Sequence, residues 1–375
     1  MWNQRRWQAL STPLASIFGS GFLVIVPILT GAVGTWSPLV MLGICVLAWF
    51  VGSTVRFNIR HVEPALADSP PAATLSLERS ADLALVVAYM ISVCLYLHIL
   101  SAFVLSGLNV DSNFNEDLLT TAIIVLITVV GIIRGLDLLE ELELWALVAT
   151  LLIIVALVAG FAWYDFVEVG SSNWSWPKKP ERTPWEVLTI VGGTLIVVQG
   201  FETTRYMGEK YSADERVESS RLAQIISTTV YVVFVGLSMP VVHLLDGQYD
   251  DNSLISMTAI AAGLLVVPLI VAALLSQFSA AVADTLAACG GLEEITHAHL
   301  QARWAYILIG MVAMALTWSA DTYQVLALAS RAFALYYMLQ CLVALSVADS
   351  VPRRLGFGLL AATLAFVTLF SVPAG

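Results

Sequence analysis

The sequence predicts an all-α polytopic membrane protein with about eleven transmembrane helices. Of its 375 residues, 59% are apolar and 12% are charged, whereas a soluble domain carries about 25% charged residues. Apolar stretches of about 20 residues, the length that crosses a bilayer as a helix, recur along the whole chain. No segment is polar enough to form a separate soluble domain, so residues 1–375 are expected to form a single transmembrane domain.

The apolar stretches define the expected spans in order. They cover residues 12–33, 37–55, 81–108, 118–133, 142–163, 185–206, 222–245, 255–289, 304–318, 323–347 and 355–372. A polar connector that contains three prolines separates the second span from the third. Three tryptophans lie close to the start of the sixth span, as is typical of a membrane interface.

Two of these spans contain helix-breaking residues. Gly19-Ser20-Gly21 interrupts the first span, and Gly200, followed by Glu202, interrupts the sixth. A glycine weakens a helix by about 1 kcal/mol relative to alanine, and a charge near the bilayer centre costs a further ~2.5–3.5 kcal/mol. Such a stretch stays in the membrane only where protein or a water-filled cavity surrounds it. Freed backbone groups beside a carboxylate therefore predict a solute or ion site.

The spacing of the two breaks predicts an internal repeat. The sixth span follows the first by five, and this odd offset turns the second unit upside down relative to the first. Corresponding breaks in two inverted halves indicate the midplane binding site of a secondary transporter. We therefore expect a first repeat over residues 12–164, a second, inverted repeat over 185–347, and an extra C-terminal helix over 353–373.

Short motifs at both breaks resemble those of a known transporter family. The matching residues are Phe18-Gly19-Ser20-Gly21-Phe22 with Pro27, Gly200-Phe201-Glu202, and Glu209 with Arg216. They look like the first-helix, sixth-helix and six–seven-loop signatures of the amino acid–polyamine–organocation (APC) superfamily. The resemblance implies the LeuT-type fold, a five-plus-five inverted repeat with discontinuous helices 1 and 6, and alternating access. The chain departs from the family pattern at the end of helix eight, in the prolines of the six–seven loop and in lacking a twelfth span.

The candidate substrate-binding residues lie at the two breaks. Small residues let the backbone leave the first helix without a side-chain clash, and half-helix N-termini direct N–H donors toward an anion such as a carboxylate. A packing patch of small residues is the alternative for the first motif. Glu202 either receives an ammonium or a proton or caps its own helix, and the resemblance favours the second role. The full set is Phe18, Gly19, Ser20, Gly21, Gln199, Gly200, Phe201, Glu202 and Thr203.

Span eight carries the candidate ion-coupling residues Ser276, Ser279 and Asp284. The two serines share a helix face, and hydroxyl oxygens there resemble the sodium site of this fold, because oxygen ligands suit a hard cation. Serines that hydrogen-bond to their own helix are the alternative. Span five lacks the lysine that replaces sodium in some proton-coupled relatives. The expected coupling ion is therefore Na⁺, or H⁺ carried by Glu202 or Asp284, and no other cofactor is expected.

Two arginines are candidates for charge pairing or gating. Arg331 lies within span ten, and buried charges in membranes are usually paired, so Asp284 or Glu202 is its expected partner. Arg205 lies near the end of span six and is expected to extend to the membrane surface.

Several classes of protein are excluded. No nucleotide-binding glycine loop, nucleophile elbow or H-E-x-x-H motif occurs in the sequence, so neither ATP-driven pumping nor enzyme activity is expected. The net charge of −11 argues against a nucleic-acid partner. His297 and His299 share a loop with two glutamates, but metal binding is not expected there. The oligomeric state is not predicted.

The distribution of positive charge predicts the orientation. With the N-terminus inside, thirteen Lys and Arg residues lie on or near the cytoplasmic side and three lie outside, which is the bias of the positive-inside rule. We therefore expect a multi-pass protein of the cell (inner or plasma) membrane with a cytoplasmic N-terminus.

The expected function is secondary active transport of a small organic solute by alternating access coupled to an ion gradient. An amino acid or an amine is the expected solute. The expected partners are this solute and the lipid bilayer. The main alternatives are a membrane-embedded sensor that keeps the pocket without turnover, and a transporter of another solute or of an inorganic ion. A passive channel and a membrane-embedded enzyme are weaker alternatives.

Overall fold

The computed structural model describes residues 4–19, 21–68, 71–136, 140–171, 174–245, 247, 249–297 and 299–373, which form helices and no strands. The α-helices are α1 (Gln4–Gly19), α2 (Ile25–Val33), α3 (Ser37–Phe57), α4 (Glu63–Asp68), α5 (Ala72–Gly107), α6 (Asn113–Arg134), α7 (Glu140–Ser171), α8 (Pro184–Gly192), α9 (Ala213–Val242), α10 (Ser253–Ala262), α11 (Val266–Ile295), α12 (Ala302–Thr317), α13 (Thr322–Val347) and α14 (Val351–Phe370). Shorter helical segments are η1 (Gly34–Trp36), η2 (Asn58–Val62), η4 (Leu195–Val198), η5 (Phe201–Met207), η6 (His243–Leu245) and η7 (Gly263–Leu265).

The chain is a multi-pass membrane protein. Eight helical segments of the described chain are long and apolar enough to cross a membrane. The helix α12 is apolar but shorter, the first span is built from two helical pieces, and the sixth is built from three. Counted with these three, the spans number about eleven. The predicted all-α polytopic fold with discontinuous helices 1 and 6 is confirmed.

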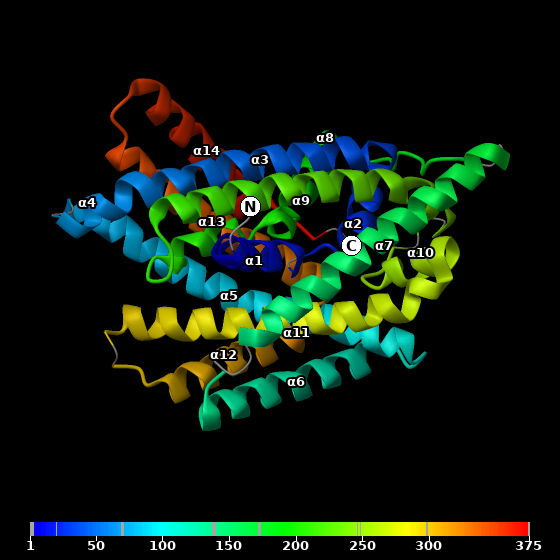
Figure 1. Ribbon diagram of the computed structural model, residues 1–375, viewed down its shortest axis with the longest axis horizontal. Helices are drawn as coiled ribbons and strands as arrows, with labels where there is room; N and C mark the ends of the chain where they lie inside the picture. Colours follow the sequence, from blue (N-terminus) through cyan, green and yellow to red (C-terminus); the bar gives the residue numbers. More distant parts are fainter. Residues whose placement is uncertain are drawn as a thin grey trace.

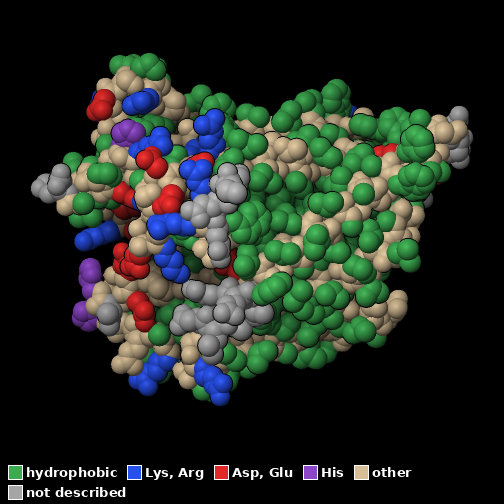
Figure 2. Space-filling view, in the orientation of Figure 1, with side chains coloured by type: hydrophobic (Ala, Val, Ile, Leu, Met, Phe, Trp, Pro, Cys, Tyr) green, Lys and Arg blue, Asp and Glu red, His purple; other side chains and the backbone are tan. Residues whose placement is uncertain are grey.

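Charged side chains are concentrated at one end of the face seen in Figure 2. Hydrophobic side chains cover most of the face seen in Figure 2, whereas charged side chains gather over its left end. We call this the charged end; it contains α4 and the ion pair between Arg60 and Asp214, whose side chains are 3.0 Å apart. An apolar belt that ends in a charged rim is the pattern a bilayer requires, because charged side chains favour water over hydrocarbon.

The centre of the bundle is built on α5 and α11, which pack along each other (Figure 1). Both are the third helix of their predicted repeat. α5 is the most deeply buried of the eight long apolar segments. α6 and α12 pack together on one outer side, while α3 and α14 lie on the other side of the central pair (Figure 1). α1 lies between α9, α7 and α11.

Both predicted helix breaks are present. In the first span, α1 ends at Gly19, residues 21–24 form a turn, and α2 begins at Ile25. In the sixth span, α8 ends at Gly192 and is followed by the two short 3₁₀ segments η4 and η5 on either side of Gly200. The predicted site residue Ser20 lies outside the described residues.

The start of α8 is set by local sequence. Thr183 and Glu186 form a reciprocal capping box, in which Thr183 Oγ1 accepts from the Glu186 backbone N–H at 3.3 Å and Glu186 Oε2 accepts from the Thr183 N–H at 2.7 Å. Pro184 occupies the first turn of the helix, where its missing N–H costs nothing. These residues fix where the first half of the broken sixth span begins.

The structure corrects the predicted eighth span. Residues 255–289 are not one helix: α10 ends at Ala262, η7 turns the chain, and only α11 crosses the bundle. Gly263 weakens the helix at this point. Pro268 lies in the first turn of α11, where a proline fits a new helix better than the middle of an old one. Apolarity alone did not reveal this boundary, because both sides of the turn are equally hydrophobic.

Candidate functional site

The two helix breaks lie directly against each other. A Cβ added to Gly200 would lie 2.6 Å from the Ile17 backbone nitrogen, and one added to Gly21 would lie 2.6 Å from Val197 Cγ2. Gly200 also has φ 127°, a backbone conformation that side chains disfavour. Glycine is therefore required at Gly200 for two independent reasons, close approach and backbone conformation.

Tyr231 of α9 connects the two breaks and was not predicted from sequence. Its hydroxyl lies 2.8 Å from the carbonyl oxygen of Val197 and 3.0 Å from that of Ile17, both of which accept its hydrogen bond. Its ring stacks on Phe18, with ring centroids 5.9 Å apart. On the α11 side, Gln277 Nε2 donates to the carbonyl oxygen of Gly19 at 2.9 Å. Side chains from α9 and α11 thus satisfy carbonyl groups that the broken helices leave free.

Replacing Tyr231 with phenylalanine is expected to lower the stability of the protein by about 1–3 kcal/mol, because two buried carbonyl groups lose their donor. Thermal melting of purified protein in detergent measures this loss. Tyr164→Phe, on α7 away from the breaks, is the matched control. Equal melting temperatures for the two variants would contradict the bridging role.

Glu202 holds its own break rather than lining the cavity. Its Oε2 accepts from the Gly200 N–H at 2.8 Å and from the Tyr337 hydroxyl at 2.6 Å, and the residue is fully buried. Phe201 stacks on the ring of Tyr337, with centroids 5.3 Å apart. Of the two roles considered for this carboxylate, the geometry is that of a cap on the free end of η5.

Two substitutions at Glu202 separate capping from charge. Glu202→Ala is expected to cost about 2–3 kcal/mol, since a buried donor that loses its partner costs about 1–3 kcal/mol. Glu202→Gln is expected to cost much less, because its amide oxygen can still accept both hydrogen bonds. The melting temperatures of the two variants report the difference. Equal losses would assign the role to the negative charge instead.

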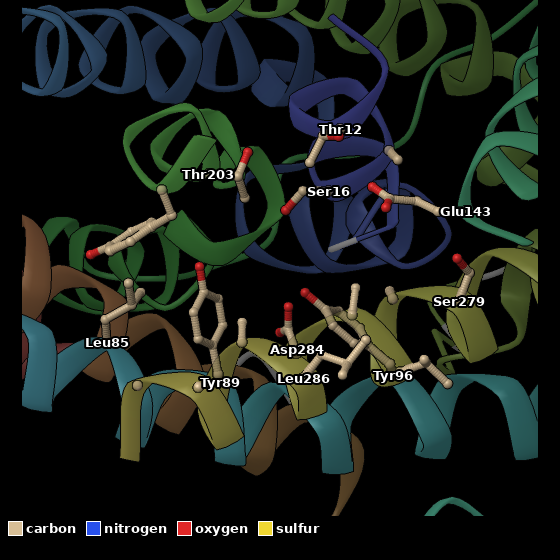
Figure 3. A pocket seen from close by; sticks show the side chains of 18 of the residues that line it. Thr12, Ser16, Leu85, Tyr89, Tyr96, Glu143, Thr203, Ser279, Asp284 and Leu286 are labelled. Carbon is tan, nitrogen blue, oxygen red and sulfur yellow. The ribbon is translucent and has the colours of Figure 1, made fainter. Parts of the chain in front are cut away.

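A cavity of about 560 Å³ lies beside the first break. Its walls come from α1, η5, α5, α7 and α11 (Figure 3). The lining residues extend from Phe18 to Glu294 near the end of α11. Four of its lining residues are acidic, namely Asp82, Glu143, Asp284 and Glu294. None of the described residues that line it is Lys, Arg or His. The lining is therefore acidic, and its ionised carboxylates would attract cations.

Asp284 is the acidic group closest to the middle of this cavity wall. In Figure 3 it lies between Tyr89 and Tyr96 and faces Ser16 across the cavity. The residue is 7% exposed, and its carboxylate accepts a hydrogen bond from the Ser92 hydroxyl. Within the described chain no Lys, Arg or His side chain pairs with it. A buried carboxylate requires either a cation partner or a proton.

The structure brings some predicted site residues to the cavity and places others behind its wall. Phe18, Thr203, Ser276, Ser279 and Asp284 line the cavity. Gly19, Gly21, Gln199, Gly200, Phe201 and Glu202 form the packed breaks behind it. Gln199 reaches the wall indirectly, because its Nε2 donates to the Tyr96 hydroxyl at 3.2 Å.

The sequence reading missed the face of α5 that lines the cavity. Tyr89, Ser92 and Tyr96 are spaced by three and four residues and therefore share one side of the helix. All three contact the cavity or Asp284. The helical spacing of these polar side chains in a long apolar segment could have predicted that this face of α5 lines a cavity.

Arg205 does not extend to the membrane surface as expected. Its side chain is 5% exposed and pairs with Glu78 of α5 at 2.6 Å. Arg216 of α9 pairs with Glu63 of α4 at 2.6 Å and donates to the carbonyl oxygen of Arg205 at 2.9 Å. Carboxylates on α4 and α5 retain these cations inside the bundle. These ion pairs and the hydrogen bond attach the end of η5 near Arg205 to α4, α5 and α9.

Arg331 is not paired with either of its expected partners. Its guanidinium donates to the backbone carbonyl of Ser371 at the end of α14, with Nε 2.8 Å from that oxygen. Asp284 and Glu202 bind other groups, as described above. The carbonyl groups at a helix C-terminus carry a partial negative charge, which makes them a suitable partner for a cation.

The chain is similar to known proteins in three comparisons. A family model described as an APC superfamily transporter matches residues 1–371. An uncharacterized protein of Aquifex aeolicus (strain VF5) is 39% identical over an alignment of 375 positions. The alignment covers 98% of this chain and 91% of the relative. A crystal structure of a mutant manganese transporter from Eremococcus coleocola has a TM-score of 0.57 at 13% identity and covers 98% of this chain and 87% of that one. The last likeness concerns the fold alone.

Broken helices that meet beside a cavity within the membrane are the features of a transporter. The chain belongs to the APC superfamily of transporters, as the family match and the relative show.

Proposed function

We propose that the protein is a secondary active transporter that moves a small organic solute, an amino acid or an amine, by alternating access coupled to an Na⁺ or H⁺ gradient. The observation that carries the proposal is the acidic cavity beside the paired breaks, with Asp284 in its wall. A volume of about 560 Å³ falls within the range of about 300–1,000 Å³ that small-molecule sites occupy.

The lining favours a solute that carries an ammonium group. Four carboxylates provide the charge, and the aromatic faces of Tyr89 and Tyr96 flank Asp284 (Figure 3). A cation over a tyrosine face gains roughly 0.5–2 kcal/mol.

Of the two proposed solutes, an amine fits better than an amino acid. An amino acid needs donors for its carboxylate as well, and the lining offers no basic side chain among its described residues. Two N–H groups of the second break already have acceptors: Gly200 donates to Glu202, and Ile196 donates to Ser330 Oγ at 3.1 Å. Backbone donors for a carboxylate are therefore fewer here than the break motif suggested.

The coupling ion is proposed to bind between the first break and α11. Gly19 lies against this helix, since a Cβ added there would lie 3.2 Å from Ala280 and 3.9 Å from Ser276 Oγ. Ser276 and Ser279 line the cavity at this level, and Asp284 can carry a proton or balance a sodium ion. With the proposed cytoplasmic N-terminus, the end of the cavity lined by Glu294 faces the cytoplasm, as expected of an inward-facing state.

Matched solute pairs test the proposal. Phenethylamine and phenylalanine share one side chain, as do isobutylamine and valine, and differ in the carboxylate. We expect the amines to raise the melting temperature of the purified protein more than the amino acids do, because a bound ligand stabilises the folded state. Mn²⁺ is included as a third probe, and stabilisation by Mn²⁺ alone would favour an inorganic ion instead.

Uptake into proteoliposomes then separates transport from sensing. We expect saturable uptake of the stabilising solute that an imposed Na⁺ or H⁺ gradient stimulates. Binding without any uptake, under either gradient, would favour the membrane-embedded sensor.

A further inference from the structure

The segment that follows α14 lies against the C-terminal end of α8, where the sixth span is first interrupted. The backbone N–H of Val372 donates to the carbonyl oxygen of Thr189 in α8 at 3.1 Å. A Cβ added to Gly193 would lie 2.6 Å from the Val372 carbonyl oxygen. The chain after α14 thus contacts α8 at the point where this helix ends.

One arginine holds this segment in place. Arg331 of α13 donates to the carbonyl oxygen of Ser371 through Nε and Nη2, and Nε lies 3.4 Å from Ser371 Oγ. Ser371 is fully buried. A guanidinium that remains half-buried in a membrane span requires acceptors, and the end of α14 supplies them.

The neighbouring residue of α13 holds the break itself. Ser330 Oγ donates to the carbonyl oxygen of Gly193 at 2.7 Å and accepts from the Ile196 N–H at 3.1 Å. Two consecutive residues of α13 therefore bind α8 at its broken end, one directly and one through the segment after α14. Edge-to-face packing of Trp185 on Phe366 and Phe370, with centroids 5.6 and 5.5 Å apart, adds a contact at the other end of α8.

We propose that Arg331 and the segment Ser371–Val372 act as positioning residues for α8, and that their contacts stabilise the state in which the acidic cavity is open to the charged end. α8 has nine residues and loses its helical hydrogen bonds beyond Gly192, so contacts from other elements decide where it lies. The contacts themselves are seen in the structure, whereas their effect on the state of the cavity rests on the proposed alternating access. The residues that follow α14, the eleventh span, would then help to set the position of α8, the first part of the broken sixth span.

The test compares two disrupting variants with two matched controls. Arg331→Gln removes the guanidinium, and Gly193→Ala places a methyl group against the Val372 carbonyl. Gly236→Ala adds a methyl group to α9 where nothing lies within 4 Å. Arg353→Gln removes an exposed arginine whose guanidinium lies over the Phe57 ring. Neither control touches α8, the cavity or the breaks.

The first readout is hydrogen–deuterium exchange of full-length protein in lipid nanodiscs. We expect the peptide over residues 184–199 to exchange at least threefold faster in both disrupting variants, and to be unchanged in both controls. Arg331→Lys, which keeps the charge, should restore part of the protection. Unchanged exchange in this peptide, or an equal increase over all helices, would overturn the positioning role.

The second readout reports the state of the cavity. The native cysteines Cys45, Cys94, Cys289 and Cys341 are buried, so Thr12→Cys in the cavity wall introduces an accessible thiol. We expect a membrane-impermeant maleimide applied from the charged end to label it at least twofold more slowly in the Arg331→Gln background. An unchanged or faster rate would overturn the proposal. Neither readout needs a solute, so a failure of the proposed transport function would leave these results interpretable.

Discussion

Asp284→Asn is expected to weaken binding of an ammonium-bearing solute by at least ~30-fold, because the loss of one member of a buried charge pair costs about 2–5 kcal/mol and each 1.4 kcal/mol is tenfold in affinity. Asparagine keeps the size of the side chain and its bond with Ser92 but removes the charge. Isothermal titration with the best amine of the matched pairs measures the change. Uptake of that amine should fall in parallel.

Two control variants show whether the carboxylate binds the solute or only packs α11 against α5. Ser92→Ala removes the hydrogen bond to Asp284 and leaves its charge, so amine affinity should change by less than about threefold, the effect of roughly 0.6 kcal/mol. Glu294→Gln removes a carboxylate from the cavity at the charged end and should likewise have a small effect. If Ser92→Ala weakened binding as much as Asp284→Asn, Asp284 would be a packing residue.

Gly200→Ala is expected to abolish solute binding and to destabilise the protein. The φ of 127° costs about 1–3 kcal/mol for a residue with a side chain. The added methyl group would also overlap the backbone nitrogen of Ile17, 2.6 Å away, and overpacking costs about 1–3 kcal/mol more. The two breaks must therefore separate, and the cavity wall beside them must move. Thermal melting and amine titration measure both effects.

Gly236→Ala serves as the control for this substitution, because nothing lies within 4 Å of its added methyl group. It is expected to be neutral or slightly stabilising, since alanine favours a helix by about 1 kcal/mol. A Gly200→Ala protein that bound solute with unchanged affinity would show that the packed breaks do not control the cavity.

The breaks could be predicted from sequence because their cause is local. Gly19-Ser20-Gly21 and Gly200 weaken a helix wherever they occur, and their offset by five spans indicated the inverted arrangement. The structure confirms the discontinuous helices and adds the reason for the glycines, which is the close approach of two backbones. Asp284 was found for a similar reason, since a carboxylate in an apolar helix stands out against its neighbours.

The partners of the charged and polar groups could not be predicted, because they come from elements far apart in the chain. Arg331 binds a backbone carbonyl 40 residues away, and no residue type marks a carbonyl as a partner. Tyr231 is one aromatic residue among many in apolar helices, and its role depends on two carbonyl groups that only the fold exposes. The cavity itself arises from five separate elements and has no counterpart in any single stretch of sequence.

The two broken spans are attached to the bundle with unequal strength. At the charged end, η5 is held by the buried pair of Arg205 with Glu78, and removing one partner of a buried pair costs about 3–5 kcal/mol. The start of α1 is held by the pair of Arg5 with Glu215, whose side chains are 57% and 26% exposed; exposed pairs contribute at most about 1 kcal/mol. Under the proposed alternating access, we therefore expect tilting of α1 to be the lower-energy route for closing the cavity. The barrier of that step should fall with added salt, which screens exposed charges far more than buried ones.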